Sequence, residues 1–184
     1  MRMPTLATPR LRLDATVDAD APAISAALSD PAVAGWLARV PFPYELAHAR
    51  MFLAHAERSR RSGEAYVFAI RQRAGTDFLG LVGLQGLPGN AEVGYWLAQA
   101  HWGNGYATEA VREVLAFAFA DLGLRVVRSG VFLGNDASMR VQTKLGFTIT
   151  GQSLRVCEAK GGALPHIDTI LSRDGVAQAP QPGA

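Results

Sequence analysis

The chain has 184 residues, of which 49% are hydrophobic and 18% charged, so it can build one good core and is too short for two domains. A formal net charge of +2 provides no basic stripe for a nucleic-acid backbone, and no run of about twenty apolar residues predicts a membrane span. The start MRMPTLATPRLRL lacks the apolar segment of a secretory signal, and the single cysteine, Cys157, excludes an internal disulfide. We therefore expect one cytoplasmic domain over residues 1–173, with no nucleic-acid or membrane partner, and a disordered tail over residues 174–184.

The first third of the chain predicts a strand followed by two helices. Arg10–Leu13 alternates charged residues with leucine and reads as a strand, and Asp18–Leu28 has small and apolar residues at helical spacing. The segment PAVAGWLARVPFPYE, rich in tryptophan and proline, resists a long regular assignment. Glu45–Arg61 is amphipathic and predicts the second helix.

Three β-rich runs follow, at Ala65–Arg71, Phe78–Gln85 and Glu92–Leu97. Short turn segments, including Pro88-Gly89-Asn90, separate them. This arrangement predicts an antiparallel meander.

The second half begins with the clearest helix, Thr108–Leu122, whose apolar residues recur at intervals of three and four. Arg125–Leu133 predicts a strand. A short helix follows, which Asn135 or Asp136 can cap and Gly146 can end. Two further strands are expected, at Phe147–Val156 and Ile167–Leu171.

The segment EVGYWLAQAHWGNGYATEAV joins a strand to a helix through a glycine-interrupted loop. Gly103 and Gly105 allow a sharp turn and a close approach of a ligand, and the unpaired NH groups at the helix start suit a pyrophosphate. The spacing differs from the dinucleotide motif, and no GKS or GKT of a P-loop follows. By itself, such a loop is also consistent with a simple tight connection.

The loop WGNGYA resembles the pyrophosphate loop of the GNAT superfamily of acyl-CoA-dependent N-acyltransferases. Trp102 stands where that pattern has Arg or Gln, Gly105 is its fixed glycine and Ala107 its final small residue. With GYW in the preceding strand and TEA in the helix, the segment is similar to the branch of ribosomal-protein alanine and serine N-terminal acetyltransferases. TPRLRL, VPFPYELAHARMFL, NDASMRVQTKLGF and HIDTILS extend the resemblance from Arg10 to Ser172.

The resemblance implies a single-domain α/β (α+β) fold, with a central, mostly antiparallel mixed sheet flanked by helices. It also implies an N-acetyltransferase that uses acetyl-CoA as co-substrate and no metal, and a homodimer. The residues implied to hold the pantetheine arm and the pyrophosphate are, in chain order, Trp96, Leu97, Trp102, Gly103, Asn104, Gly105, Tyr106, Ala107 and Thr108. Asn135 would bind the coenzyme from beyond the next strand, although it can equally be a helix cap.

Acetyl transfer to an amine needs a base, a donor to the oxyanion and an acid for the departing thiolate. In the superfamily the acid is often a tyrosine, but the matching residue here is Gln142. In the ribosomal-protein branch, a serine three residues after the Asn takes the place of that acid. Ser138 stands at the position of this serine, where it could also be an ordinary first-turn residue. Two carboxylates are candidate bases, Glu158 and Glu92, and either can instead be a solvent-facing charge.

The acceptor amine is open between a protein N-terminus and a small molecule. An α-amino group has a pKa near 8 and needs only a weak base, which favours α-amines. The resemblance implies a substrate lip at Pro41–Glu45, with Phe42 and Tyr44 as walls, although a plain hydrophobic lid is equally consistent.

Two other functions compete with this interpretation. A non-catalytic acyl-CoA-binding module would keep the glycine loop and lack the acid and base. A metal enzyme is suggested by His166 and Asp168, two residues apart on one strand, but no convincing further ligands accompany them. We expect His166 to be a partly exposed polar residue and Cys157 to be a small buried hydrophobe.

Overall fold

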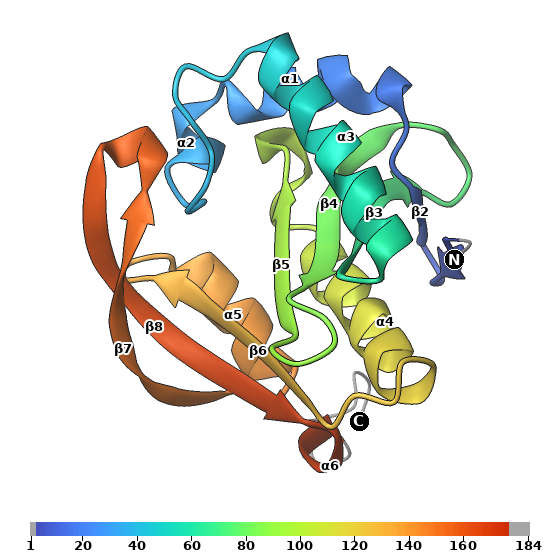
Figure 1. The fold of residues 1–184 in the computed structure, drawn as a ribbon, viewed down its shortest axis with the longest axis vertical. Coiled ribbons are helices and arrows are strands. Elements are labelled where there is room, and N and C mark those ends of the chain that lie inside the picture. The colour runs from blue at the N-terminus through green and yellow to red at the C-terminus, as the bar shows by residue number, and fades with distance from the viewer. Residues whose placement is uncertain (1–2, 177–184) are drawn as a thin grey trace.

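The computed structural model describes residues 3–176, in which an eight-stranded sheet is covered by helices on both faces (Figure 1). The strands are β1 (Leu6–Ala7), β2 (Leu11–Ala15), β3 (Ala65–Gln72), β4 (Phe78–Gln85), β5 (Glu92–Leu97), β6 (Val126–Phe132), β7 (Thr148–Cys157) and β8 (Gly162–Ser172). The α-helices are α1 (Ala21–Leu28), α2 (Pro31–Ala34), α3 (Leu46–Ser62), α4 (Tyr106–Ala120), α5 (Asp136–Lys144) and α6 (Arg173–Val176). Three short 3₁₀ helices are η1 (Asp18–Asp20), η2 (Gln99–His101) and η3 (Glu158–Lys160).

The strand order is β1-β2-β3-β4-β5-β6-β8-β7. Each neighbouring pair is antiparallel except β5 and β6, which are parallel. This confirms the α/β fold class and the mostly antiparallel mixed sheet, including the meander formed by β3, β4 and β5. The parallel pair is needed because α4 crosses over between these two strands.

The two faces of the sheet bury separate apolar clusters. The larger cluster lies between the sheet and α4, where Val111, Val114 and Leu115 pack on Phe68 and Val93. The smaller cluster lies under α1 and α3, whose apolar residues pack on β3 and β4. The apolar residues that recur at helical spacing in α4 therefore form the side of the helix that faces the sheet, as the sequence predicted.

Several expected boundaries shift. The helix expected from Thr108 begins at Tyr106, directly after Gly105. The strand expected over 167–171 extends over the whole of β8, because β8 pairs with β6 on one side and β7 on the other. Residues 173–176 form α6, whereas residues 177–184 of the expected tail lie outside the described residues, so its disorder stays a prediction. Within residues 3–176, every helix is too short or too polar to cross a lipid bilayer.

Candidate active site

A cleft of about 840 Å³ opens where β5 and β6 separate. These two strands share a single register pair, Glu92 with Arg128, and then run apart toward their carboxyl ends (Figure 1). Residues of β5, β6, the loop before α4, the start of α5 and the segment 36–40 line the cleft. Its volume is in the range of ligand-binding sites in proteins.

At the start of the gap, a side chain takes the place of the backbone hydrogen bonds that β5 and β6 no longer form. The Ser129 hydroxyl of β6 donates to the Val93 carbonyl of β5 at 2.9 Å. Alternate residues of a strand direct their backbone groups to the same edge, so Tyr95 and Leu97 also face the gap. The Trp102 ring NH donates to the Leu97 carbonyl at 2.8 Å, while the Trp96 carbonyl lies against Gly80 of β4. Of the two residues expected to bind the pantetheine arm, Leu97 turns its backbone to the gap and Trp96 turns its carbonyl to β4.

The glycine loop has the backbone geometry that its sequence predicted. Gly103 and Gly105 have φ of 77° and 75°, in the left-handed region that favours glycine. Gly105 caps α4 without a side-chain hydrogen bond, which leaves the first-turn NH groups available. The loop and first-turn residues that line the cleft are Trp102, Gly103, Gly105, Tyr106, Ala107 and Thr108.

Asn104 has a different position from the rest of the predicted loop residues. It is not among the residues that line the cleft. Its side-chain amide donates to the carbonyls of His101 and Trp102, at 3.3 and 3.0 Å. Asn104 therefore stabilises the shape of the loop.

Arg10, from the segment before β2, fixes the same loop. Its guanidinium donates to the Asn104 carbonyl at 3.0 Å and to Glu109 of α4 at 2.7 Å, and lies over the Tyr106 ring. Burial alone would raise the pKa of Glu109, but hydrogen bonds from Thr8 and Arg10 lower it. The TPRLRL segment was part of the sequence resemblance, but pattern reasoning gave Arg10 no such role.

The opposite wall of the cleft is the start of α5. The Asn135 side chain accepts from the Ser138 NH at 3.1 Å, so Asn135 is the helix cap, and it also lines the cleft. The Ser138 hydroxyl lies 2.8 Å from the hydroxyl of Tyr95 of β5, and both residues line the cleft. Burial raises the pKa of Tyr95, while hydrogen bonds to Ser138 and Gln142 act against that shift. Tyr95 therefore keeps its proton at neutral pH.

Gln142 has a structural position in the core. Its side chain is buried and donates to the Ser129 hydroxyl at 3.0 Å and to the Gly130 carbonyl at 3.2 Å. The Thr169 hydroxyl of β8 donates to its oxygen at 2.6 Å. This network joins α5 to β6 and β8, which explains why an amide can stand at this position.

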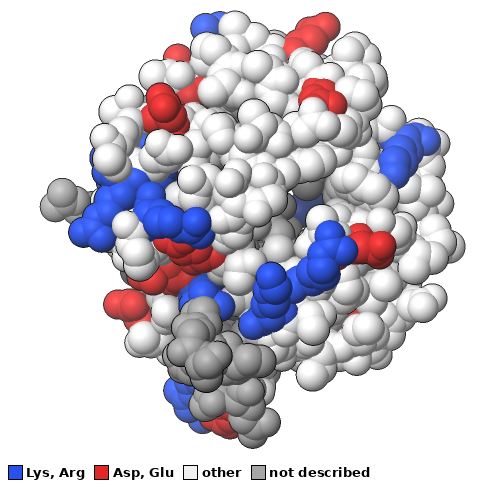
Figure 2. All heavy atoms as spheres, turned by 180° about the vertical axis from the view of Figure 1, so that it is seen from behind, with Lys and Arg blue, Asp and Glu red and all other residues white. Residues whose placement is uncertain are grey.

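Basic side chains of α5 border the cleft. Arg140 and Lys144 are one helical turn apart and both line it. The face opposite to that of Figure 1 is hollowed, and Lys and Arg side chains lie beside the hollow (Figure 2). Their charge favours an anionic ligand on this side of the sheet. Sequence analysis did not identify these two residues.

A cluster of four charged or polar side chains lies on β5, β7 and β8: Glu92, Arg155, His166 and Asp168, hereafter the polar cluster. Arg155 is 2.9 Å from Glu92 and 3.6 Å from Asp168, and His166 Nδ1 is 2.9 Å from the Asp168 carboxylate. Glu92, Arg155 and His166 line the cleft. The expectation that His166 is partly exposed is wrong, because its side chain is 7% exposed and packs edge-on against the Phe132 ring.

Besides Asn104, three predicted site residues do not line the cleft. Glu158 is exposed at the start of η3, with its NH bonded to the Ala38 carbonyl at 3.2 Å. Tyr44 is buried in the apolar cluster under α1 and α3, and Phe42 is 46% exposed. None of these three lines the cleft, so the structure does not bring Glu158 together with Ser138.

The end of β7 supports the segment 36–40 that covers the cleft. Cys157 is buried, as predicted, and its thiol donates to the carbonyls of Gly35 and Leu37 at 3.7 and 3.5 Å. The Lys160 ammonium lies 4.1 Å above the centre of the Trp36 ring. Trp36, Leu37 and Val40 then give this side of the cleft an apolar wall.

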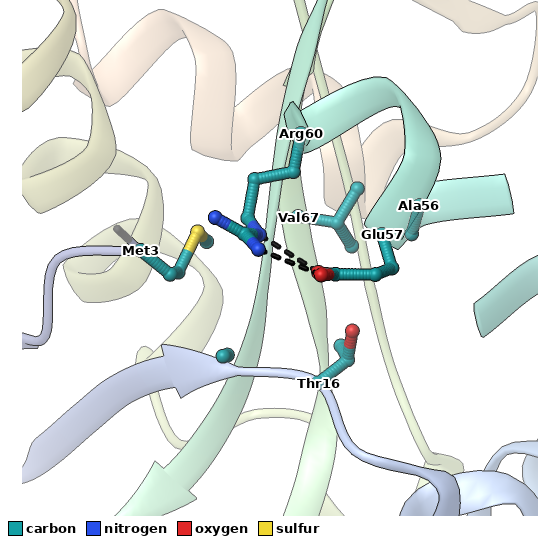
Figure 3. Close-up of a pocket in the computed structure, with 7 residues that line it drawn as sticks. Met3, Thr16, Ala56, Glu57, Arg60 and Val67 are labelled. Carbon is teal, nitrogen blue, oxygen red and sulfur yellow. Dashed lines mark hydrogen bonds and ion pairs between the residues drawn. The ribbon is translucent and has the colours of Figure 1, made fainter. Parts of the chain in front are cut away.

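A second, small pocket lies beneath α3, where Glu57 and Arg60 form an ion pair beside Met3 and Thr16 (Figure 3). Its volume of about 10 Å³ holds no more than one water molecule. Across the described residues, no group of three or more His, Cys, Asp or Glu side chains is arranged to hold a metal ion.

The chain matches the family model described as an acetyltransferase (GNAT) domain over residues 10–148. It is 30% identical over 176 residues to the N-acetyltransferase p20 of Bacillus licheniformis, covering 94% of this chain and 98% of that protein. Its fold matches Mycobacterium smegmatis RimJ in complex with CoA-disulfide, with a TM-score of 0.86 and 21% identity over 97% of this chain and 93% of RimJ. It also matches the ribosomal-protein-S5-alanine acetyltransferase of Vibrio fischeri, with a TM-score of 0.80 and 18% identity over 93% and 97% of the two chains.

Proposed function

Because the chain belongs to the GNAT acetyltransferase family, we propose that it acetylates the α-amino group at the N-terminus of a protein, using acetyl-CoA. The observation that carries this proposal is the path of the cleft. It begins at the glycine loop before α4, passes between β5 and β6, and reaches the polar cluster. A coenzyme and an amine can therefore enter one gap from two ends.

The residues of the loop fit the coenzyme. A Cβ at Gly103 would meet no atom within 4 Å, so the space over the loop is open, and the first-turn NH groups of α4 are free to bind a pyrophosphate. Arg140 and Lys144 supply positive charge on the facing helix. The backbone of Tyr95 and Leu97 offers hydrogen bonds to the amide groups of a pantetheine arm. Acetyl-CoA supplies an acetyl thioester, whose C–S bond breaks as the new C–N bond forms.

Ser138 is the donor that we assign to the departing sulfur. Its hydroxyl can give a proton or a hydrogen bond to the thiolate, and the Tyr95 hydroxyl can in turn donate to Ser138. Tyr95 is then a positioning residue behind Ser138. In the superfamily, a tyrosine at the position of Gln142 often protonates the departing sulfur. In this chain, Ser138 and Tyr95 together would supply that proton donor.

The choice of an α-amine rests on chemistry and on similarity. An α-amino group, with a pKa near 8, is partly unprotonated at neutral pH, whereas a lysine amine, with a pKa near 10.4, is almost fully protonated. Neither candidate carboxylate is a free base in the cleft, since Glu92 is paired with Arg155 and Glu158 is exposed outside it. The Vibrio fischeri neighbour is named as a ribosomal-protein alanine acetyltransferase, which agrees with this choice.

The test uses purified protein, acetyl-CoA and peptides that begin with serine or alanine. Controls are the same peptides with a blocked N-terminus and one internal lysine, together with a panel of small amines. We expect release of free thiol and a mass gain on the free α-amine, undiminished by a chelator. Acetylation of small amines alone would overturn the protein substrate, and coenzyme binding without any transfer would favour the non-catalytic module.

A homodimer is part of the same proposal. β7 is the edge strand of the sheet, and Ile149, Leu154 and Val156 on it are 64%, 71% and 59% exposed. An exposed apolar edge strand is a surface that a second copy can cover. Light scattering that gives a monomer mass at every concentration would contradict this.

A further inference from the structure

His166 has the surroundings of a functional imidazole. It lies within β8 and is opposite Phe132 of β6 and Ser153 of β7 in the strand register. Its side chain is 7% exposed, yet the residue lines the cleft. The nearly buried ring therefore borders the space where an amine and a thioester would meet.

The contact with Asp168 determines which ring nitrogen carries the proton. His166 Nδ1 is 2.9 Å from the Asp168 carboxylate. An ionised carboxylate only accepts hydrogen bonds, so Nδ1 is the donor and carries the proton. In the neutral ring, Nε2 is then the nitrogen with a free lone pair, and it makes no hydrogen bond to the described residues.

Charges from three strands face this ring. Burial lowers the pKa of His166 and the Arg155 charge on β7 lowers it further, while Asp168 on β8 and Glu92 on β5 act in the opposite direction. Burial alone would raise the pKa of Asp168, but the hydrogen bond to His166 and the charge of Arg155 lower it. At neutral pH the pair is therefore a neutral imidazole next to a carboxylate. From β6, the uncharged residues Phe132 and Gly130 contact the ring.

Gly130 makes room for the free nitrogen. A Cβ at this position would lie 2.9 Å from His166 Nε2 and would overlap Cε1. Gly130 itself lines the cleft, so the Nε2 edge of the ring lies beside the cleft wall. A side chain at residue 130 would displace the imidazole.

We propose that His166 is the general base of the acetyl transfer and that Asp168 is its positioning residue; this rests on the proposed function. The amine nitrogen attacks the thioester carbonyl carbon, and its N–H proton passes to His166 Nε2. The C–S bond breaks with its electron pair on sulfur, and the thiolate takes a proton from the Ser138 hydroxyl. His166 then releases its proton to water, and the Ser138 oxygen takes a proton back from water, so that both side chains return to their starting states while Tyr95 keeps its proton.

Activity is measured from pH 5 to 9 with an accepted N-terminal peptide for wild type, His166→Gln and Asp168→Asn. His55→Gln, on the exposed surface of α3, is the matched control. A general base raises the rate by about 10²- to 10⁴-fold, so turnover by His166→Gln should fall by that factor at neutral pH. The decrease in wild-type activity at low pH, where the imidazole becomes protonated, should be absent from the profile of this variant. Asp168→Asn should shift the pH at which activity falls on the acidic side, because it removes the carboxylate that keeps the proton on His166 Nδ1. Stabilisation by CoA should persist in all variants. Wild-type turnover and profile in His166→Gln would overturn the proposal.

A second measurement is read on the folded wild-type protein. NMR of ¹⁵N-labelled histidine reports the protonation of each ring nitrogen. The His166 signals are assigned by their loss in His166→Gln or, if that variant does not fold, by exclusion with glutamine variants of His48, His55 and His101. We expect a neutral ring protonated on Nδ1 at pH 7. A charged ring, or a ring protonated on Nε2, would overturn the base assignment even if acetyl transfer is observed. Absence of transfer to every amine, with the expected tautomer present, would instead overturn the proposed function and the base role with it.

Discussion

The hydroxyl oxygens of Tyr95 and Ser138 lie 2.8 Å apart at the wall of the cleft, although the two residues come from β5 and α5. Tyr95 Oη is also 3.2 Å from the Ser138 carbonyl oxygen. The first turn of α5 is thus attached to the strand that borders the gap. The contact holds the Ser138 hydroxyl oxygen at the cleft wall, a constraint that an exposed first-turn serine would lack.

Ser138→Ala should lower turnover much more than it weakens coenzyme binding, because a donor to the leaving sulfur acts mainly in the transition state. The expected loss in kcat is about tenfold to a thousandfold, by analogy with the removal of one oxyanion donor. Tyr95→Phe should cause a smaller loss. If the two hydroxyls act as a unit, the double variant should be no slower than Ser138→Ala. Equal losses in kcat and in CoA affinity would instead indicate a structural role.

Gly105→Val should abolish the stabilisation of the protein by CoA. A ligand at one hundred times its Kd stabilises the folded state by about 2.7 kcal/mol, which is roughly 5–10 °C in Tm for a domain of this size. The valine would strain the left-handed backbone and occupy the space of the pyrophosphate. Gly63→Val is the matched control, since Gly63 has φ 77° at the end of α3 with open space around it. It should lower Tm by strain and keep the CoA shift; retention of that shift by Gly105→Val would show that the loop does not hold the coenzyme.

The sequence alone predicts the elements of this fold well, for local reasons. The spacing of apolar residues identifies α4, and runs of β-branched and aromatic residues identify β3 to β5. The two glycines of the loop indicate a sharp turn, and both have the positive φ values that favour glycine. The same reasoning misses the early separation of β5 from β6, because the pairing of these two strands is non-local and ends after one register pair, beyond which the Ser129 hydroxyl bonds to the Val93 carbonyl.

The catalytic environment is less predictable because burial depends on non-local neighbours. The sequence gives no sign that Phe132 and Gly130 pack against His166, or that Arg155 forms an ion pair with Glu92. An aromatic residue beside prolines, such as Tyr44, fits both a substrate wall and a core, and only packing distinguishes the two. Predicted roles for single polar residues thus need the structure, whereas the backbone geometry of the glycine loop follows from its sequence.

Asp20→Ala should destabilise the protein strongly. Both carboxylate oxygens of Asp20 accept from Arg71 at 2.9 Å, and the two side chains are 5% and 9% exposed. Removing one partner of a buried ion pair costs about 3–5 kcal/mol. Asp14 stays paired with Arg71 at 2.8 Å in this variant, so we expect a loss toward the lower end of that range. Asp18→Ala is the matched control, because Asp18 forms an exposed pair with Arg50 at 4.0 Å, which contributes at most about 1 kcal/mol. Urea unfolding at pH 7 measures both; similar midpoints for the two variants would contradict the prediction.

The stability of the protein should fall as the pH is lowered from 7, partly because of His166. Its pKa in the folded protein is below the ordinary value of 6.5, by burial first and then by Arg155. Between these two pKa values the unfolded chain binds a proton that the folded chain does not, so stability rises with pH in this range. The contribution of His166 is therefore complete above about pH 6.5 and declines below it. Asp168, whose pKa is also lowered, adds a similar dependence only below its unfolded value of 3.8.

Urea midpoints of wild type and His166→Gln at pH 7.5, 6.5 and 5.5 measure this contribution. The two midpoints should differ least at the lowest pH, because the wild type loses the contribution of His166 on acidification and the glutamine has no proton to gain. If the two midpoints fall in parallel over this range, the imidazole is not kept neutral by its surroundings, and the base role of His166 loses its physical support.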